Sequence, residues 1–154
     1  MLEGVLYMII RLQPDQIVLF WDMIRKSMIE SNKVPKEFQQ DYAINVLTKF
    51  LSGMLQAWVG YKVDEEGVKK LHTVFASSIV DEKHHGVRIL NAEAIYGFRL
   101  IDEELLIEIY IKMEEFAKAN NCTVLSADYS FNRVKDILLS AGFEEHKTIC
   151  RKFI

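Results

Sequence analysis

The sequence has little cysteine, no excess of positive charge and no long apolar run, and each absence excludes a class of protein. Its 154 residues contain two cysteines, Cys122 and Cys150, with no CxxC spacing. We interpret both as buried thiols, because disulfide frameworks belong mainly to small secreted domains and a zinc site needs further ligands. No apolar stretch approaches the roughly 20 residues that cross a bilayer. We therefore expect a cytoplasmic protein without a membrane partner.

The charge and the missing motifs exclude further classes. The formal net charge is −3 at pH 7, whereas proteins that bind nucleic acid usually carry a basic excess. The sequence contains no Ser-His-Asp, Walker or HExxH pattern. Neighbouring histidines rarely converge on one ion without more ligands, so His84 and His85 indicate a solvated loop. We predict neither a metal nor a nucleic-acid partner.

Length and composition predict one globular domain over residues 1–154. Half of the residues are apolar and 27% are charged, which is the ordinary composition of a folded domain. Met8 is an alternative start of the chain, which would make residues 1–7 a non-essential N-terminal extension. Neither the oligomeric state nor a protein partner can be inferred from the composition.

The spacing of apolar residues predicts the order of the elements. Helices place apolar residues three and four positions apart, whereas strands are short segments rich in β-branched and aromatic residues. The sequence predicts strands over residues 5–12, 56–62, 71–80, 87–96, 123–127 and, as one or two strands, 143–153. It predicts helices over residues 15–31, 35–53, 102–120 and 132–141.

The resulting order, β-α-α-β-β-β-α-β-α-β, predicts an α/β domain. Three consecutive strands joined by short polar loops are typical of an antiparallel meander. A later strand-helix-strand unit beside this meander implies a mixed sheet with helices on both sides.

Four segments in this order resemble the GNAT (Gcn5-related N-acetyltransferase) superfamily. Residues 51–59 resemble the passage from the second helix to the second strand, and residues 116–124 the end of the central helix entering the fifth strand. Residues 138–145 are similar to the closing helix with its Gly-Phe turn. Residues 148–154 resemble a truncated final strand, and this short ending is similar to GNAT-like proteins encoded by bacteriophages. The resemblance implies a GNAT-like fold and an N-acetyltransferase that uses acetyl-CoA.

The sequence departs from the family at its phosphate-binding loop. Active GNAT enzymes carry an R/Q-x-x-G-x-G/A loop whose backbone N–H groups bind the cofactor pyrophosphate at a helix N-terminus. Here one glycine, Gly97, remains, and bulky Leu100 and Ile101 follow it. Residues 102–104 are acidic, which stabilises the helix they open and repels a pyrophosphate. The motif is therefore degenerate, and three acids that cap a helix explain these residues as well.

The resemblance also implies candidate site residues. Many GNAT enzymes use a tyrosine to protonate the leaving thiolate, and Leu138 stands at that position. Tyr129 or Ser126 could replace it as general acid. Glu93 is the acidic residue within the fourth strand, either a base for an acceptor amine or a solvated side chain. The candidate residues for binding acetyl-CoA are Ile95, Tyr96, Gly97, Phe98, Arg99 and Asn132.

Strand alternation assigns the side chains around Glu93 to two faces of the sheet. The predicted faces are Leu90, Ala92, Ala94 and Tyr96 on one side and Asn91, Glu93 and Ile95 on the other. Two functions follow. The first is a GNAT-like N-acetyltransferase with an unknown acceptor amine. The alternative is an inactive GNAT-fold phage or prophage protein that binds a protein partner or acts in virion assembly.

Overall fold

The computed structural model describes residues 6–84, 86–99, 101–128, 132–145 and 152 of the chain. Its strands are β1 (Leu6–Arg11), β2 (Leu55–Val63), β3 (Lys69–Glu82), β4 (Val87–Gly97) and β5 (Val124–Ala127). Its helices are α1 (Pro14–Leu19), α2 (Trp21–Ser31), the 3-10 turn η1 (Lys36–Phe38), α3 (Gln39–Ser52), α4 (Glu103–Ala119) and α5 (Asn132–Ser140).

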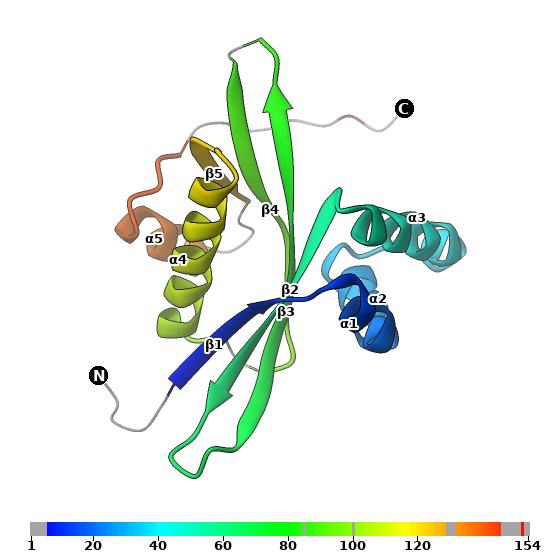
Figure 1. The fold of residues 1–154 in the computed structure, drawn as a ribbon, viewed down its shortest axis with the longest axis horizontal. Coiled ribbons are helices and arrows are strands. Elements are labelled where there is room, and N and C mark those ends of the chain that lie inside the picture. Colours follow the sequence, from blue (N-terminus) through cyan, green and yellow to red (C-terminus); the bar gives the residue numbers. More distant parts are fainter. Residues whose placement is uncertain (1–5, 85, 100, 129–131, 146–151, 153–154) are drawn as a thin grey trace.

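The five strands form one mixed sheet in the order β1-β2-β3-β4-β5. Each pair from β1 to β4 is antiparallel, and β5 runs parallel to β4 after the crossover through α4. Long β2–β3 and β3–β4 hairpins extend in opposite directions from the centre of the sheet (Figure 1). The predicted meander and mixed sheet are confirmed.

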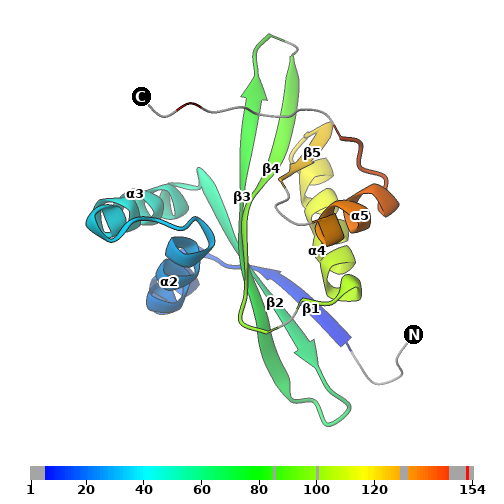
Figure 2. The same ribbon diagram turned by 180° about the vertical axis from the view of Figure 1, so that it is seen from behind.

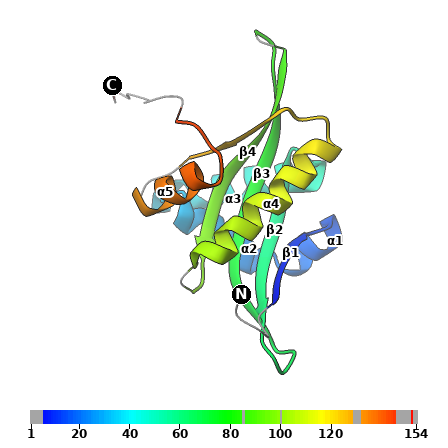
Figure 3. The ribbon, with the colours of Figure 1, turned by 90° about the vertical axis from the view of Figure 1, so that its left-hand side faces the viewer.

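Helices cover both faces of the sheet, as predicted. In Figures 1 and 2, α1, α2 and α3 lie on one face, and α4 and α5 lie on the other. We call these the α2 face and the α4 face. Figure 3 shows α4 lying across the sheet. Buried side chains form one apolar cluster on each face, built around Ile24 and Phe50 on the α2 face and around Leu105 and Ile109 on the α4 face. The sheet is thus the middle layer of three.

Two predicted helices have different boundaries in the structure. The predicted helix over residues 15–31 is two helices that meet at Phe20, where the backbone leaves the helical conformation (φ −102°, ψ 17°). Since Phe20 is neither glycine nor proline, no sequence signal marks this break. The next helix begins with η1 rather than at Pro35. It ends as predicted at Gly53, whose positive φ of 82° suits a residue without a Cβ atom.

The two chain ends are partly outside the described residues. β1 already includes Leu6 and Tyr7, which pair with Val63 and Lys62 of β2. At the other end residues 143–145 are not in a strand, and most of the predicted closing strand lies outside the described residues. Cys122 is buried, and Cys150 is outside the described residues. None of the helices in the described part of the chain has both the length and the apolar content that a membrane crossing requires.

Candidate active site

The sheet opens between β4 and β5. The parallel pairing begins at Ile89 and Val124 and ends at Ala92 and Ala127. β4 continues to Gly97 beyond that point, so its last residues have no β5 partner within the described chain. A stretch of strand edge without a partner strand can pair with an extended ligand through its backbone N–H and C=O groups.

Glu93 is an extra residue in β4 at the start of this opening. Two consecutive residues of β3, Ala76 and Ser77, pair with Ala94 and Ala92. Glu93 therefore has no opposite residue, which defines a β-bulge. A bulge bends its strand and increases the local twist. It coincides with the point where β4 and β5 separate.

The bulge also corrects the predicted faces of β4. Leu90 and Ile95 both pack against the α4 face, whereas Ala94 packs against the α2 face. Tyr96 joins Ala94, since its hydroxyl donates a hydrogen bond of 2.6 Å to Glu30 of α2. The predicted regular alternation from Leu90 to Tyr96 is wrong, because one inserted residue exchanges the faces of all side chains after it.

A cleft of about 450 Å³ lies where β4 and β5 separate. We call it the β4 cleft. The end of α2, the last half of β4, the β4–α4 junction, α4, the end of β5 and α5 all contribute to its walls. Its apolar wall comes from α4 and α5 and includes Leu106, Tyr110, Val134 and Ile137.

One end of the β4 cleft is formed around Glu93. Its carboxylate accepts a hydrogen bond from the Ser78 hydroxyl of β3. Asn32 at the end of α2 also lines the cleft, and its amide donates 2.9 Å hydrogen bonds to the Tyr42 hydroxyl and to a carbonyl of α2. Burial, and to a smaller extent the Glu93 charge, raises the pKa of Tyr42 against the opposing effect of Asn32. This end of the cleft is polar and negatively charged.

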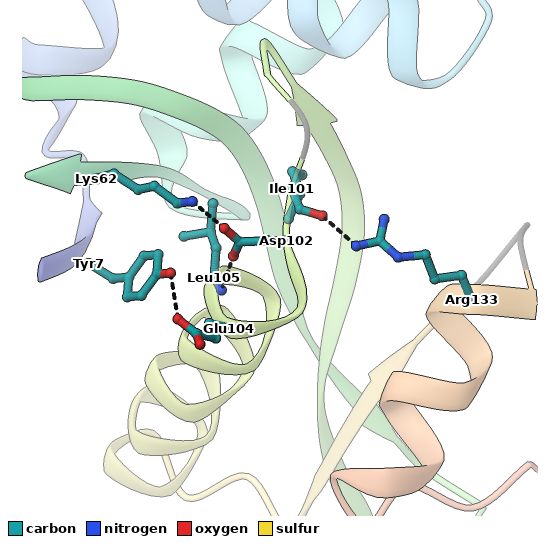
Figure 4. A network of polar contacts seen from close by, with 7 residues as sticks. All are labelled: Tyr7, Lys62, Ile101, Asp102, Glu104, Leu105 and Arg133. Atoms are coloured by element: carbon teal, nitrogen blue, oxygen red, sulfur yellow. Dashed lines mark hydrogen bonds and ion pairs between the residues drawn. The ribbon is translucent and has the colours of Figure 1, made fainter. Parts of the chain in front are cut away.

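The other end lies at the β4–α4 junction and is formed around two arginines. Arg99 follows β4, and Arg133 lies in the first turn of α5; both line the cleft. Arg133 donates a hydrogen bond of 3.2 Å from Nη2 to the Ile101 carbonyl oxygen (Figure 4). Asp128 at the end of β5 is the carboxylate nearest in sequence to Arg133 that lines the same cleft.

The acids at the start of α4 have partners on the opposite side of the junction. Asp102 is the N-cap, and its Oδ1 accepts a 2.8 Å hydrogen bond from the Leu105 N–H. Its other oxygen pairs with Lys62 of β2, and Glu104 accepts a 2.9 Å hydrogen bond from Tyr7 of β1. In Figure 4, Lys62 and Tyr7 lie on one side of the junction and Arg133 on the other. The helix-capping interpretation of these acids is confirmed for Asp102.

Asp102 and Tyr110 are among the groups in this region whose pKa values are shifted. Burial alone would raise the pKa of Asp102, but hydrogen bonds from Lys62 and the Leu105 N–H, with the charges of Lys62 and His72, lower it below its ordinary value. Burial raises the pKa of Tyr110 to about 12. The Tyr110 hydroxyl is buried, and no hydrogen-bond partner for it occurs among the described residues. A buried hydroxyl without a partner can donate a hydrogen bond to a ligand.

The structure brings some of the candidate residues together and separates others. Of the residues predicted from the sequence, Glu93, Ile95, Gly97 and Arg99 line the β4 cleft. Tyr96 and Phe98 instead pack edge to face, with ring centroids 5.0 Å apart. Asn132 is the exposed first residue of α5, beside Arg133. Ser126 is half-buried in β5, Leu138 is buried in the α4 face, and Tyr129 lies outside the described residues.

Three cleft residues had no signal in the sequence that marked them as functional. Arg133 is one of several charged residues in a short helix, Asn32 follows a helix end, and Tyr110 follows the apolar period of α4. Each becomes a site residue only when elements far apart in the chain meet. His84 is exposed in its turn, and His85 lies outside the described residues. No group of three potential metal ligands occurs in the described part of the chain.

Comparison with known proteins assigns this architecture. No protein-family model and no curated protein sequence matches the chain. A predicted acetyltransferase from Clostridium acetobutylicum, solved with acetyl-CoA, superposes with a TM-score of 0.68 at 12% identity over 96% of both chains. The chain has the GNAT fold.

Two further similar structures are enzymes whose names state the acceptor of the acetyl group. The aminoglycoside N-acetyltransferase AAC(6')-Iy in complex with CoA aligns with a TM-score of 0.66 at 13% identity over 100% of this chain and 98% of its own. Glucosamine-6-phosphate N-acetyltransferase from Arabidopsis thaliana aligns with a TM-score of 0.64 at 12% identity over 96% and 98%. At these identities the likeness shows the fold alone, so the function must be argued from the β4 cleft.

Proposed function

We propose that the protein is an acyl-CoA-dependent N-acetyltransferase whose acceptor is an amine. The observation that carries this proposal is the opening of the GNAT fold beyond Ala92, where β4 leaves β5 and the β4 cleft begins. The structural neighbours that contain acetyl-CoA or CoA support it.

The residues of the β4 cleft fit the acyl carrier. The open edge of β4 presents peptide groups that match the amide groups of a pantetheine arm, as an added strand would. Leu106, Val134 and Ile137 supply an apolar wall for its methylene groups. The buried Tyr110 hydroxyl adds a donor without a partner among the described residues. Acetyl-CoA would supply an acetyl group activated as a thioester.

In this proposal Glu93 is the base for the acceptor amine. Its carboxylate is exposed in the cleft, and Ser78 orients it by a hydrogen bond. In the proposed reaction Glu93 takes the proton of the amine while the nitrogen forms a bond to the acetyl carbon and the C–S bond breaks. The sulfur then takes up a proton, for which Tyr129 is the predicted donor. Positioned general bases of this kind contribute about 10²- to 10⁴-fold to a rate.

Binding of acetyl-CoA is the first test. We expect micromolar binding by isothermal titration and a rise in melting temperature with ligand, because ligand at 100 times Kd stabilises the folded state by about 2.7 kcal/mol. An absence of binding at millimolar acetyl-CoA would contradict the proposed function.

Transfer to a panel of primary amines, followed by release of free thiol, is the second test. We expect Glu93→Gln to lower kcat about 10²- to 10⁴-fold and to leave acetyl-CoA affinity within twofold of wild type. Glu37→Gln, at an exposed position in η1, is the matched control and should retain full activity. Wild-type turnover in Glu93→Gln would remove Glu93 from the mechanism.

A GNAT-fold protein that binds a partner without catalysis is the second candidate. It is favoured by large apolar side chains exposed on α1 and α3, among them Leu19 (75% exposed) and Met54 (64% exposed), just beyond the end of α3. Large exposed apolar groups are common at protein interfaces. If acetyl-CoA does not bind, a Leu19→Ser and Met54→Ser double variant tests this role: retention of self-association or partner binding in that variant would contradict it.

A further inference from the structure

The β4–α4 junction carries acidic side chains at the helix N-terminus, where a phosphate site usually has none. Asp102 and Glu104 fill the N-terminus of α4 with negative charge, which opposes a phosphate at that helix end. Both carboxylates are engaged by Lys62 and Tyr7, on the β1–β2 side of the junction. The side that faces the β4 cleft carries positive charge instead.

Two arginines from separate elements supply that positive charge. Arg99 comes from the junction and Arg133 from α5, and both line the cleft. The Arg133 contact with the Ile101 carbonyl oxygen holds its guanidinium at the junction and uses one of its five N–H donors (Figure 4). Arg99 has no ion pair or hydrogen bond within the described part of the chain, and neither arginine pairs there with Asp128.

We propose that Arg99 and Arg133 form a clamp that binds the pyrophosphate of CoA from two sides, in place of a glycine-rich backbone loop. The inference rests on the proposed function, because it assigns the carrier's phosphates within the same cleft. Guanidinium groups suit this role, since they stay charged and bind phosphate oxygens through paired N–H donors. The phosphate is thereby bound by side chains that line the β4 cleft, whereas Asp102 and Glu104 of the α4 N-terminus are engaged by Lys62 and Tyr7.

Titration of four proteins with two ligands tests the clamp. The proteins are wild type, Arg99→Gln, Arg133→Gln and the double variant; the ligands are CoA and S-acetylpantetheine, which has no pyrophosphate. We expect each single substitution to weaken CoA binding about 10-fold and the double substitution about 100-fold, which corresponds to about 1.4 kcal/mol per arginine. S-acetylpantetheine should bind all four proteins with the same affinity.

Two controls separate recognition of phosphate from a general effect on the fold. Arg25→Gln removes an exposed arginine of α2 and should leave CoA affinity unchanged. Arg133→Lys keeps the charge but not the paired donors, so it should recover only part of the affinity. Since Arg133→Gln also removes the Ile101 contact, its melting temperature without ligand is measured. Arg99→Gln removes no hydrogen bond or ion pair with the described part of the chain.

The outcomes distinguish the clamp from the proposed function. If wild type and the double variant bind CoA equally, the clamp is wrong and the acetyltransferase proposal stands. If the double variant loses S-acetylpantetheine as well, the arginines shape the cleft and do not recognise phosphate, which also overturns the clamp. If wild type binds neither ligand, the clamp and the proposed function fail together.

Discussion

Both halves of β4 lie beside β3, but only the first half also lies beside β5 in the described chain. β4 pairs with β3 on both sides of the bulge at Glu93, but within the described residues only Ile89–Ala92 pair with β5. The first half is ordinary sheet, with Leu90 fully buried. The second half has no β5 partner in the described chain, and Glu93, Ala94, Ile95 and Gly97 line the β4 cleft. A single inserted residue at Glu93 thus separates a stretch of strand that stabilises the fold from one that is available to a ligand.

The largest effect expected on stability comes from the paired half. Leu90 is 0% exposed and belongs to the α4-face core, so Leu90→Ala should lower the free energy of unfolding by about 2–5 kcal/mol. The half-buried Ile95 borders the cleft, and Ile95→Ala should cost less than half as much. Urea denaturation measures both. Equal losses would mean that the open half contributes as much to the fold as the paired half.

A smaller effect is expected where the open half ends. A Cβ atom added at Gly97 would lie 2.9 Å from the Arg99 carbonyl oxygen and 3.2 Å from Cγ1 of Ile101. Gly97→Ala should therefore cost about 1–3 kcal/mol, the usual cost of overpacking, and should weaken CoA binding by moving Arg99.

A double-mutant cycle with Ile101→Ala, which removes both Ile101 carbons near the added Cβ, identifies the contact responsible. Because the nearer contact of the added Cβ is with backbone, Gly97→Ala should cost the same in the Ile101→Ala background. Full recovery in that background would assign the cost to the Ile101 side chain instead.

The comparison also shows which features a sequence can reveal. The helices and strands followed from apolar spacing, and the ends at Gly53 and Gly142 followed from glycine, which has a positive φ at both positions (82° and 93°). The bulge at Glu93 could not be predicted, because an extra residue is defined only against the partner strand. The helix break at Phe20 could not be predicted either, because neither glycine nor proline marks it.

Only part of the candidate site was singled out from the sequence. The resemblance to GNAT enzymes and the strand pattern pointed to Glu93, Gly97 and Arg99, which lie on or next to one strand and line the β4 cleft; their roles stay predictions. Arg133 joins them from 34 positions beyond Arg99 (133 − 99), across a helix and another strand. Local sequence patterns carry no information on contacts between residues so far apart in the chain. For the same reason the ion pair between Lys62 and Asp102 could not be predicted.

The smallest effect is expected at the cap that closes the junction. Asp102→Ala removes the hydrogen bond to the Leu105 N–H and the ion pair with Lys62, and should cost about 0.5–2 kcal/mol at pH 7, the usual cost of losing an N-cap. Asp102→Asn is the matched variant, since asparagine can cap the helix but cannot pair with Lys62. It should lose less than half as much.

The pH dependence of this difference isolates the charge of Asp102. A carboxylate whose pKa is lower in the folded state stabilises the fold above its unfolded pKa of about 3.9, and this contribution is lost as the pH falls through the folded value. The pKa of Asp102 is lowered in the fold. The free energy of unfolding of wild type should therefore exceed that of Asp102→Asn by a constant amount between about pH 7 and pH 5. Below about pH 4 the two unfolding free energies should converge. A gap that stays constant into strong acid, where the carboxylate is protonated, would show that the charge of Asp102 is not the source of the difference between the two proteins.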